Sequence, residues 1–291
     1  MTKLGTKTDH PVADLSAYNR SMSAVLDKIF FLDKVEADVF IDFGCADGFL
    51  IETMQKFYPN KTYIGYDINP EMLKAAAKRL GSKETWGAET VSIRIGKNIK
   101  ITKDWAEVMI AVRRIQDEGL RVCVILSSVI HEIYSYGPAK VEEFWNQLWS
   151  LNADFIAIRD MSVSSTTSRP SDPITVARIR QTYNREMLAQ WETQWGSLEE
   201  NWSLVHFLLH YRYTTNWERE LRENYLPINK ERLLALVPVN YFPHFIEHFT
   251  LPFIRQKVMD DFGIQLQDAT HLKLILRRIK DSLPSGTNNH V

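Results

Sequence analysis

Short apolar runs alternate with stretches of helical spacing over the first 160 residues of the chain. The apolar runs predict strands near residues 39–43, 62–67, 91–95, 121–127 and 154–160, and the intervening stretches predict helices near 21–32, 48–58, 70–80, 103–118 and 138–150. Because strands that alternate with helices build βαβ units, this pattern predicts a doubly wound α/β fold with a mostly parallel sheet. The run "VCVILSS" is apolar at consecutive positions, which is typical of a central strand that helices cover on both faces.

The pattern changes after Met161, where the polar segment "SVSSTTSRPSDP" predicts a loop. Asp172 is expected to cap a helix that begins at Pro173 and continues to Gly196. We interpret residues 1–160 as the core of the fold and residues 161–237 as a helical insertion, or lid, over the ends of the strands.

A second helix is expected inside this insertion. Thr215 and Glu218 have the spacing of a capping box, and Glu218 and Arg222 form a favourable i,i+4 pair. Pro227 is expected to end this helix, because proline cannot continue one.

Strand patterns return near the end of the chain. "YFPHFIEHFTL", which begins at Tyr241, and "HLKLILRRI" predict two strands, with a helix between them that ends near Phe262. Residues 238–281 are therefore expected to complete the sheet, and residues 282–291 are expected to be a disordered tail.

A glycine-rich turn and an acid follow the first two predicted strands. The stretch "FIDFGCADGFL" leaves its apolar run for Gly44, Cys45, Ala46, Asp47 and Gly48. The stretch "YIGYDINPEML" ends its apolar run on Asp67. Glycines let the backbone approach a ligand closely, and an acid at the carboxyl end of a neighbouring strand can accept both hydroxyls of a ribose. The pattern predicts a nucleoside-containing cofactor. The alternative is that the glycines only shape the turn and the acid only caps a helix.

The dinucleotide fingerprint Gly-x-Gly-x-x-Gly is not matched, because Ala46 and Phe49 stand at its second and third glycines, which disfavours NAD. Instead, "IDFGCADGFL" resembles the first motif of class I S-adenosylmethionine-dependent methyltransferases, Asp-x-Gly-x-Gly-x-Gly, with Ala46 at the middle glycine. "YIGYDINPEML" resembles their second motif, whereas the third is not recognisable in "IRIGKNIKI". The resemblance covers roughly residues 20–160 and the last two strands. It implies S-adenosylmethionine as cofactor and a seven-stranded sheet, with five parallel strands first and the helical insertion before the final pair.

The resemblance also implies roles for individual residues. Asp42 would lie near the methionine amino group of the cofactor, and Gly44 to Gly48 would wrap its methionine portion. Asp67 would bind the ribose, while Ile68 and Asn69 would flank the adenine.

In this family the fourth strand ends at the cofactor's methyl group, and here it ends in Ser127 and Ser128, with His131 and Glu132 just beyond. We take the two serines as candidate cofactor contacts. The Asn/Asp-Pro-Pro-aromatic signature of adenine methyltransferases does not occur in this segment, which disfavours that subclass.

A histidine here is similar to one that deprotonates a hydroxyl in several small-molecule O-methyltransferases. Histidines titrate near neutral pH, and Glu132 or another acid could orient the ring. The plainer alternative is that His131 only begins a helix.

Other polar clusters are interpreted as structural. Arg159 and Asp160 close the fifth strand at the same edge of the sheet, where a satisfied charge pair is common. The histidines at i,i+4 spacing lack a Cys or a Glu-x-x-His partner, so no metal site is predicted. These histidines are His206, His210, His244 and His248.

Composition narrows the class of protein. A chain of 291 residues that is 45% hydrophobic, with a formal net charge of -1, predicts a globular protein without a broad phosphate-binding surface. Cys45 and Cys123 lie in the turn and in a predicted strand, which disfavours a structural disulfide. The N-terminus has no signal-peptide pattern and no run is long enough to span a membrane, so a cytoplasmic protein with no membrane partner is expected.

Together these features predict a methyltransferase that acts on a small molecule or a nucleic acid, with O-methylation favoured. The competing hypothesis is a noncatalytic S-adenosylmethionine-binding partner or sensor. Release of S-adenosylhomocysteine that depends on an acceptor would separate the two.

Overall fold

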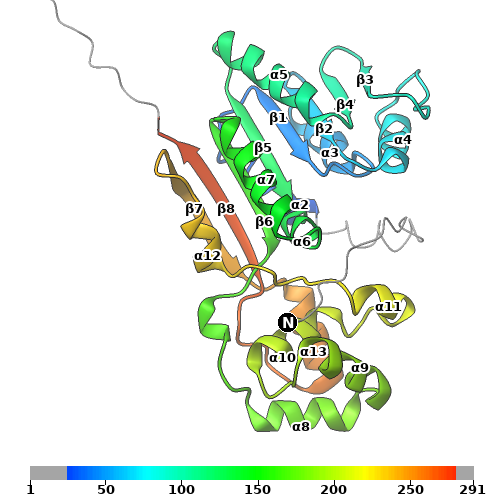
Figure 1. The fold of residues 1–291 in the computed structure, drawn as a ribbon, viewed down its shortest axis with the longest axis vertical. Coiled ribbons are helices and arrows are strands. Elements are labelled where there is room, and N and C mark those ends of the chain that lie inside the picture. Colours follow the sequence, from blue (N-terminus) through cyan, green and yellow to red (C-terminus); the bar gives the residue numbers. More distant parts are fainter. Residues whose placement is uncertain (1–24, 280–291) are drawn as a thin grey trace, which may run out of the picture.

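The computed structural model describes residues 25–279, and its centre is an eight-stranded sheet of order β3-β4-β2-β1-β5-β6-β8-β7 (Figure 1). The strands are β1 Val39–Phe43, β2 Thr62–Tyr66, β3 Ser92–Ile95, β4 Ile99–Thr102, β5 Val122–Ser127, β6 Phe155–Met161, β7 Tyr241–Phe249 and β8 His271–Arg278. Neighbouring strands from β4 through β2, β1 and β5 to β6 are parallel, whereas β3, β8 and β7 join by antiparallel pairing. The predicted doubly wound, mostly parallel α/β fold is confirmed.

The sheet has one strand more than the predicted seven. The run near residues 91–95 was expected to be the third parallel strand, but β3 is the outer arm of a hairpin, and β4 supplies the parallel partner of β2. Gly96 has φ +59°, a left-handed conformation that a tight turn between the two arms requires. The sequence analysis did not predict a separate strand for the short apolar stretch "IKIT", which follows this turn and forms β4.

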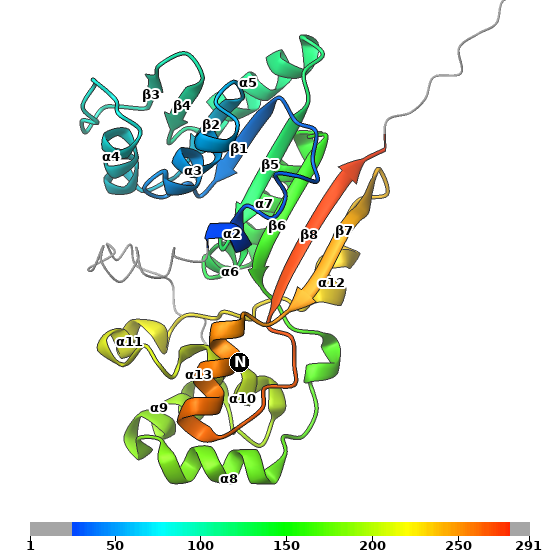
Figure 2. The same cartoon turned by 180° about the vertical axis from the view of Figure 1, so that it is seen from behind.

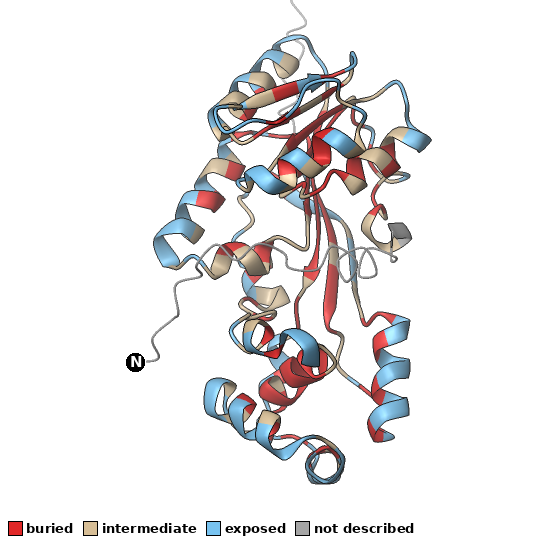
Figure 3. Cartoon of the chain, turned by 90° about the vertical axis from the view of Figure 1, so that its right-hand side faces the viewer, coloured by how far each residue is buried: buried red, intermediate tan, exposed pale blue. Residues whose placement is uncertain are grey.

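Helices cover both faces of the sheet. The helices are α2 Val25–Lys28, α3 Phe49–Phe57, α4 Pro70–Arg79, α5 Trp105–Asp117, α6 Ile130–Tyr134, α7 Pro138–Ser150, α8 Pro173–Thr182, α9 Arg185–Trp195, α10 Asn201–His210, α11 Trp217–Glu220, α12 Lys230–Ala235 and α13 Pro252–Phe262. Helices α3 and α4 pack on one face, and α5, α6, α7 and α12 pack on the other. The inner strands are therefore buried over most of their length, whereas the edge strand β7 and the outward helix faces are largely exposed (Figure 3).

Helices α8 to α11 gather with α13 in a helical subdomain beyond the carboxyl ends of the parallel strands (Figures 1 and 2). Its own apolar core includes the fully buried Trp191 and Phe207. The chain thus supplies this subdomain from two places, because α13 lies between β7 and β8 in sequence, while α12 packs on the sheet.

The first predicted helix of the insertion is two helices. Asp172 caps α8 and Gly196 ends α9, as expected. Between them the chain turns at Tyr183, and the Asn184 side chain accepts hydrogen bonds from the N–H groups of Glu186 and Met187. Asparagine is a strong N-cap residue, so it begins a new helix where the helical spacing alone predicted continuity.

The second predicted helix is also interrupted. Helix α10 ends at His210, and the residues that were expected to form a capping box lie in a 3₁₀ turn at Thr214–Asn216 and in the short α11. The observed i,i+4 ion pair joins Arg219 to Glu223 at 2.8 Å, one position beyond the expected pair. At the other end of the chain, α2 ends at Lys28, before the predicted end at residue 32, and residues 21–24 and the predicted tail lie outside the described residues. No helix within residues 25–279 is long and apolar enough to cross a membrane.

Candidate active site

The turn between β1 and α3 lies at the carboxyl end of the central strand. Gly44 and Gly48 both have φ +74°, and Ala46 has φ +45°. A left-handed conformation costs a residue with a Cβ atom about 1–2 kcal/mol, so Ala46 holds a conformation that the family's glycine would adopt freely. Gly48 precedes α3, whose first N–H groups face the turn.

Two glycines let this turn pack closely against its neighbours. A Cβ atom on Gly44 would lie 2.8 Å from Cγ2 of Val129, just after β5. A Cβ atom on Gly65 of β2 would lie 2.9 Å from both the Cys45 Sγ and Ile51 Cδ1 atoms. The sequence analysis did not single out Gly65, although glycine inside a strand often marks a close approach of another backbone.

Asp67 ties the turn to the end of β2. Its Oδ2 atom accepts a hydrogen bond from the Ala46 N–H, and its Oδ1 atom accepts one from the Asn69 N–H, both at 2.8 Å. Burial raises the pKa of Asp67, while these N–H groups partly oppose the rise. Each carboxylate oxygen has two lone pairs, so the geometry leaves room for further donors such as ribose hydroxyls.

The residues beside Asp67 have different surroundings. Ile68 is 57% exposed, which leaves an apolar surface next to the acid. The Asn69 side-chain oxygen caps α4 by accepting the Glu71 N–H at 3.0 Å. In the turn itself, the buried Asp47 carboxylate forms an ion pair with Arg79 at 2.6 Å, so this acid fastens α4 to the turn.

Asp42 is an almost fully buried acid near the end of β1, only 3% exposed. Burial raises its pKa to about 7; the nearby ammonium of Lys28 lowers the pKa, and the carboxylates of Asp67 and Asp47 raise it further. Cys45, also in this region, has a pKa well above its ordinary value because of burial, and both cysteines are free thiols.

The end of β5 is held by a buried charge network. Ser128 has φ +58°, and its Oγ atom accepts a hydrogen bond from Arg159 Nη1 at 3.0 Å. Arg159 Nε in turn donates to the Asp27 carboxylate at 2.7 Å. The Ser127 Oγ atom is buried and has no hydrogen-bond partner within residues 25–279. We call the carboxyl ends of β1, β2, β5 and β6, with the residues that directly follow them, the rim.

His131 and Asp160 form a close pair on the rim. His131 Nδ1 lies 2.8 Å from Asp160 Oδ1, and the other Asp160 oxygen accepts the Ile130 N–H at 2.7 Å. Burial alone would raise the pKa of Asp160, but the His131 ring and the neighbouring N–H groups outweigh burial and lower it. Glu132 lies 3.9 Å from His131 Nε2, beyond hydrogen-bond distance, so Asp160 is the acid that orients the ring.

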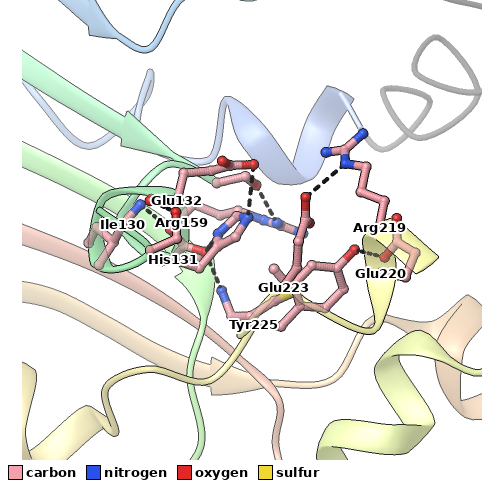
Figure 4. Close-up of polar contacts among 12 residues, drawn as sticks. Ile130, His131, Glu132, Arg159, Arg219, Glu220, Glu223 and Tyr225 are labelled. Atoms are coloured by element: carbon pink, nitrogen blue, oxygen red, sulfur yellow. Dashed lines mark hydrogen bonds and ion pairs between the residues drawn. The ribbon is translucent and has the colours of Figure 1, made fainter. Parts of the chain in front are cut away.

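Residues 217–225, here called the α11 segment, face this pair from the helical subdomain (Figure 4). The Tyr225 ring meets the His131 ring edge to face at 5.6 Å and stacks on His210 at 3.8 Å. The Tyr225 hydroxyl donates to Glu220 at 2.5 Å. Burial raises the pKa of Glu220 to about 6 and the pKa of Tyr225 well above its ordinary value. No sequence signal pointed to these two residues, because their partners come from distant elements.

Side chains of the helical subdomain fix the α11 segment in place. Trp195 Nε1 donates to the Leu221 carbonyl at 2.8 Å, and the Tyr225 N–H donates to His206 Nε2 at 3.1 Å. His206 and His210 are both fully buried among aromatic rings, and burial lowers the pKa of each. Within residues 25–279 no group of three or more His, Cys, Asp or Glu side chains could hold a metal ion.

Comparison with known proteins identifies the sheet portion of the chain. Residues 34–135 match the family model described as "Methyltransferase domain", and this range contains the turn, Asp67 and His131. The chain therefore contains a methyltransferase domain. No curated protein matches the chain by sequence.

Several solved structures resemble this methyltransferase at low identity. The plantazolicin methyltransferase BamL, solved with a desmethylplantazolicin analogue and SAH, is 12% identical, with a TM-score of 0.45 over 91% of this chain and 89% of that chain. The pyocyanin biosynthetic protein PhzM is 13% identical, with a TM-score of 0.46 over 90% of this chain and 57% of that chain. A SAM-dependent methyltransferase from Archaeoglobus fulgidus is 14% identical, with a TM-score of 0.42 over 90% and 99% of the two chains. At this identity the likeness does not extend to acceptor or mechanism.

The chemistry of the turn fits a nucleoside-containing methyl donor. Backbone in the left-handed region leaves one side of the turn without side-chain bulk, Asp67 offers carboxylate oxygens, and Ile68 offers an exposed apolar surface. Asp42 supplies a buried carboxyl group near the end of β1, just before the turn.

Proposed function

We propose that this methyltransferase transfers the methyl group of S-adenosylmethionine to a hydroxyl of a small molecule that binds between the rim and the α11 segment. His131 acts as the general base in this proposal. The observation that carries it is the 2.8 Å contact between His131 Nδ1 and Asp160 Oδ1, at the strand end where the transferred methyl group would lie.

The cofactor would be held by the turn and by two acids. Asp42 would bind the methionine ammonium, the backbone from Gly44 to Gly48 would surround the methionine portion, and Asp67 would accept the ribose hydroxyls. Ile68 would cover the adenine. The side chains of Asp47 and Asn69 are used in an ion pair and a helix cap, so we assign these residues only backbone contacts.

The proposed role of Asp42 predicts how cofactor affinity depends on pH. Its pKa of about 7 means that in the free protein the carboxyl takes up a proton as the pH falls below 7, in a site that it shares with Lys28, Asp67 and Asp47. An ammonium binds the ionised form, so binding must then expel that proton. We expect affinity to fall by up to about tenfold per pH unit below 7, measured by calorimetric titration between pH 5.5 and 7.5. The variant Asp42→Asn should show weak binding without this dependence, and a wild-type affinity that stays constant over this range would contradict the assignment.

The chemistry of His131 follows from its partner. A carboxylate at Nδ1 keeps the ring proton on that nitrogen, which leaves the lone pair on Nε2 to accept a proton. When bound, S-adenosylmethionine supplies an electrophilic methyl group. His131 Nε2 takes the proton of the acceptor hydroxyl as its oxygen bonds to the methyl carbon, and Asp160 stabilises the resulting imidazolium.

A small acceptor is favoured over a nucleic acid by the charges around His131. Glu132 lies on the rim, and Glu220 and Glu223 face it from the α11 segment (Figure 4). Arg219 pairs with Glu223 at 2.8 Å, and Arg159 pairs with Asp27, so these two cations are already engaged. A phosphate backbone would meet carboxylates here, whereas nucleic-acid sites present free Lys and Arg side chains.

One experiment tests the proposed function. The protein is incubated with methyl-labelled S-adenosylmethionine and separated fractions of small metabolites, RNA, DNA and protein. We expect label to enter the small-metabolite fraction as a base-stable methyl ether, with stoichiometric release of S-adenosylhomocysteine. Label in RNA or DNA would overturn the small-molecule acceptor, and binding without acceptor-dependent release would favour the noncatalytic alternative.

A further inference from the structure

Residues 128–131 lead from β5 into α6 and make two contacts that the site depends on. Val129 packs directly against the turn after β1, where its Cγ2 atom lies 2.8 Å from the place that a Cβ atom on Gly44 would take. His131 Nδ1 lies 2.8 Å from Asp160 Oδ1. A small shift of this segment would therefore displace both the proposed general base and a neighbour of the turn.

Ser128 begins this segment in a conformation that serine rarely adopts. Its φ of +58° is left-handed, which brings the Cβ atom close to the following carbonyl. Such a conformation persists only where the surrounding structure imposes it. The Ser128 N–H donates to the Arg159 carbonyl at 2.7 Å, and the Ser128 Oγ atom accepts from Arg159 Nη1 at 3.0 Å. One residue of β6 thus holds both the backbone and the side chain of Ser128.

The Arg159 side chain is itself fixed by contacts outside this segment. It is 6% exposed, and its Nε atom donates to the Asp27 carboxylate of α2 at 2.7 Å. Asp27 also pairs with Lys273 of β8 at 2.9 Å. Arg159 and Asp160, which were expected to form a charge pair, have different partners, because successive residues of a strand point to opposite faces of the sheet. The guanidinium therefore donates from a fixed position.

We propose that Arg159 is a positioning residue for methyl transfer, which holds Ser128 in its left-handed conformation and thereby keeps His131 in place. This role rests on the proposed function, in which His131 is the general base. A misplacement of about 1 Å in a reacting group can cost about 10²-fold in rate, so such a hold matters for turnover. The alternative is that Arg159 only balances the buried charge of Asp27.

The test compares two substitutions of Ser128 that remove the same hydroxyl. Alanine keeps the Cβ atom that disfavours the left-handed conformation, whereas glycine adopts this conformation freely. The readout is the Nδ1–H proton of His131 in NMR spectra of the full chain without ligands, identified by its absence in His131→Ala. We expect this proton to exchange with water about 5- to 30-fold faster in Ser128→Ala than in wild type, because the segment leaves its place more often. In Ser128→Gly the rate should stay within about threefold of wild type.

Substitutions of the arginine complete the test. Arg159→Met removes the donor and should speed the exchange as much as Ser128→Ala does. The double variant Ser128→Gly/Arg159→Met should return to within about threefold of wild type, because a glycine needs no partner to stay left-handed. The control is Arg278→Met, which removes an arginine that pairs with Asp154 at 3.7 Å, just before the start of β6, and it should leave the rate unchanged.

Two results would overturn the inference. They are equal exchange rates in Ser128→Ala and Ser128→Gly, and a wild-type rate in Arg159→Met. Thermal melts show whether Arg159→Met is folded; if it is not, the two Ser128 substitutions decide, because they leave the ion pair between Arg159 and Asp27 in place. Failure of the proposed function is a separate outcome. Wild-type turnover in His131→Ala would remove the catalytic purpose of the hold, whereas the exchange rates test the hold itself.

Discussion

Replacing His131 with alanine should lower turnover by about 10²- to 10⁴-fold, the usual contribution of a general base, while S-adenosylmethionine affinity changes little. The reason is that His131 Nε2 takes the proton of the acceptor in the proposed mechanism, whereas the cofactor contacts come from the turn and Asp67. Steady-state rates with the identified acceptor and a calorimetric titration measure the two effects separately.

The matched control for this variant is His244→Ala, which removes an exposed histidine from β7 and should keep wild-type turnover. If His131→Ala kept wild-type turnover between pH 6 and 8, the general-base role would be wrong. The methyltransferase assignment would not be affected. Loss of cofactor binding in His131→Ala would show instead that the ring holds the rim together. An acceptor amine that arrives neutral would also make the loss much smaller, because alignment then supplies most of the rate.

The second large effect is expected for Asp160→Asn, which should lower turnover by about 10²- to 10⁴-fold. An asparagine cannot accept from both His131 Nδ1 and the Ile130 N–H with its two polar atoms, since one of them is an NH₂ group. If the NH₂ group faces His131, the ring proton moves to Nε2, where it blocks the base. Asp160 acts through His131 and is thus a positioning residue.

The comparison of turnover with cofactor affinity distinguishes this role from a merely structural one. Asp160→Asn should lose turnover while its S-adenosylmethionine affinity stays near that of wild type. The matched control is Glu132→Gln, which removes a carboxylate 3.9 Å from Nε2 and should cost less than about tenfold. A larger loss for Glu132→Gln than for Asp160→Asn would transfer the orienting role to Glu132.

Local patterns in the sequence were sufficient for the core of the fold. The predicted ranges 39–43 and 138–150 match the bounds of β1 and α7, and Pro173 marked the start of α8 correctly. The cofactor turn could also be predicted from the sequence. Gly44 and Gly48 mark two positions, four residues apart, where the backbone is left-handed.

Features that depend on distant partners could not be read in this way. Tyr225 becomes part of the site only because His206 and His210, on another helix, hold its backbone and ring against the rim. The break at Asn184 was missed for a different reason, since the capping preference of one asparagine competed with helical spacing on both sides of it.

The central claim is that the turn after β1 and Asp67 together bind S-adenosylmethionine, and a calorimetric titration of wild type and Asp67→Ala tests it most directly. We expect wild type to bind S-adenosylmethionine and S-adenosylhomocysteine with micromolar affinity, with no competition from NAD. Asp67→Ala should lose about 1–3 kcal/mol of binding free energy through the loss of charge-assisted hydrogen bonds. Asp172→Ala is the matched control, because Asp172 accepts a backbone N–H at 2.9 Å at the start of α8 in the helical subdomain, and its loss should leave affinity unchanged. Unchanged affinity in Asp67→Ala, or binding of NAD in place of S-adenosylmethionine, would contradict the account.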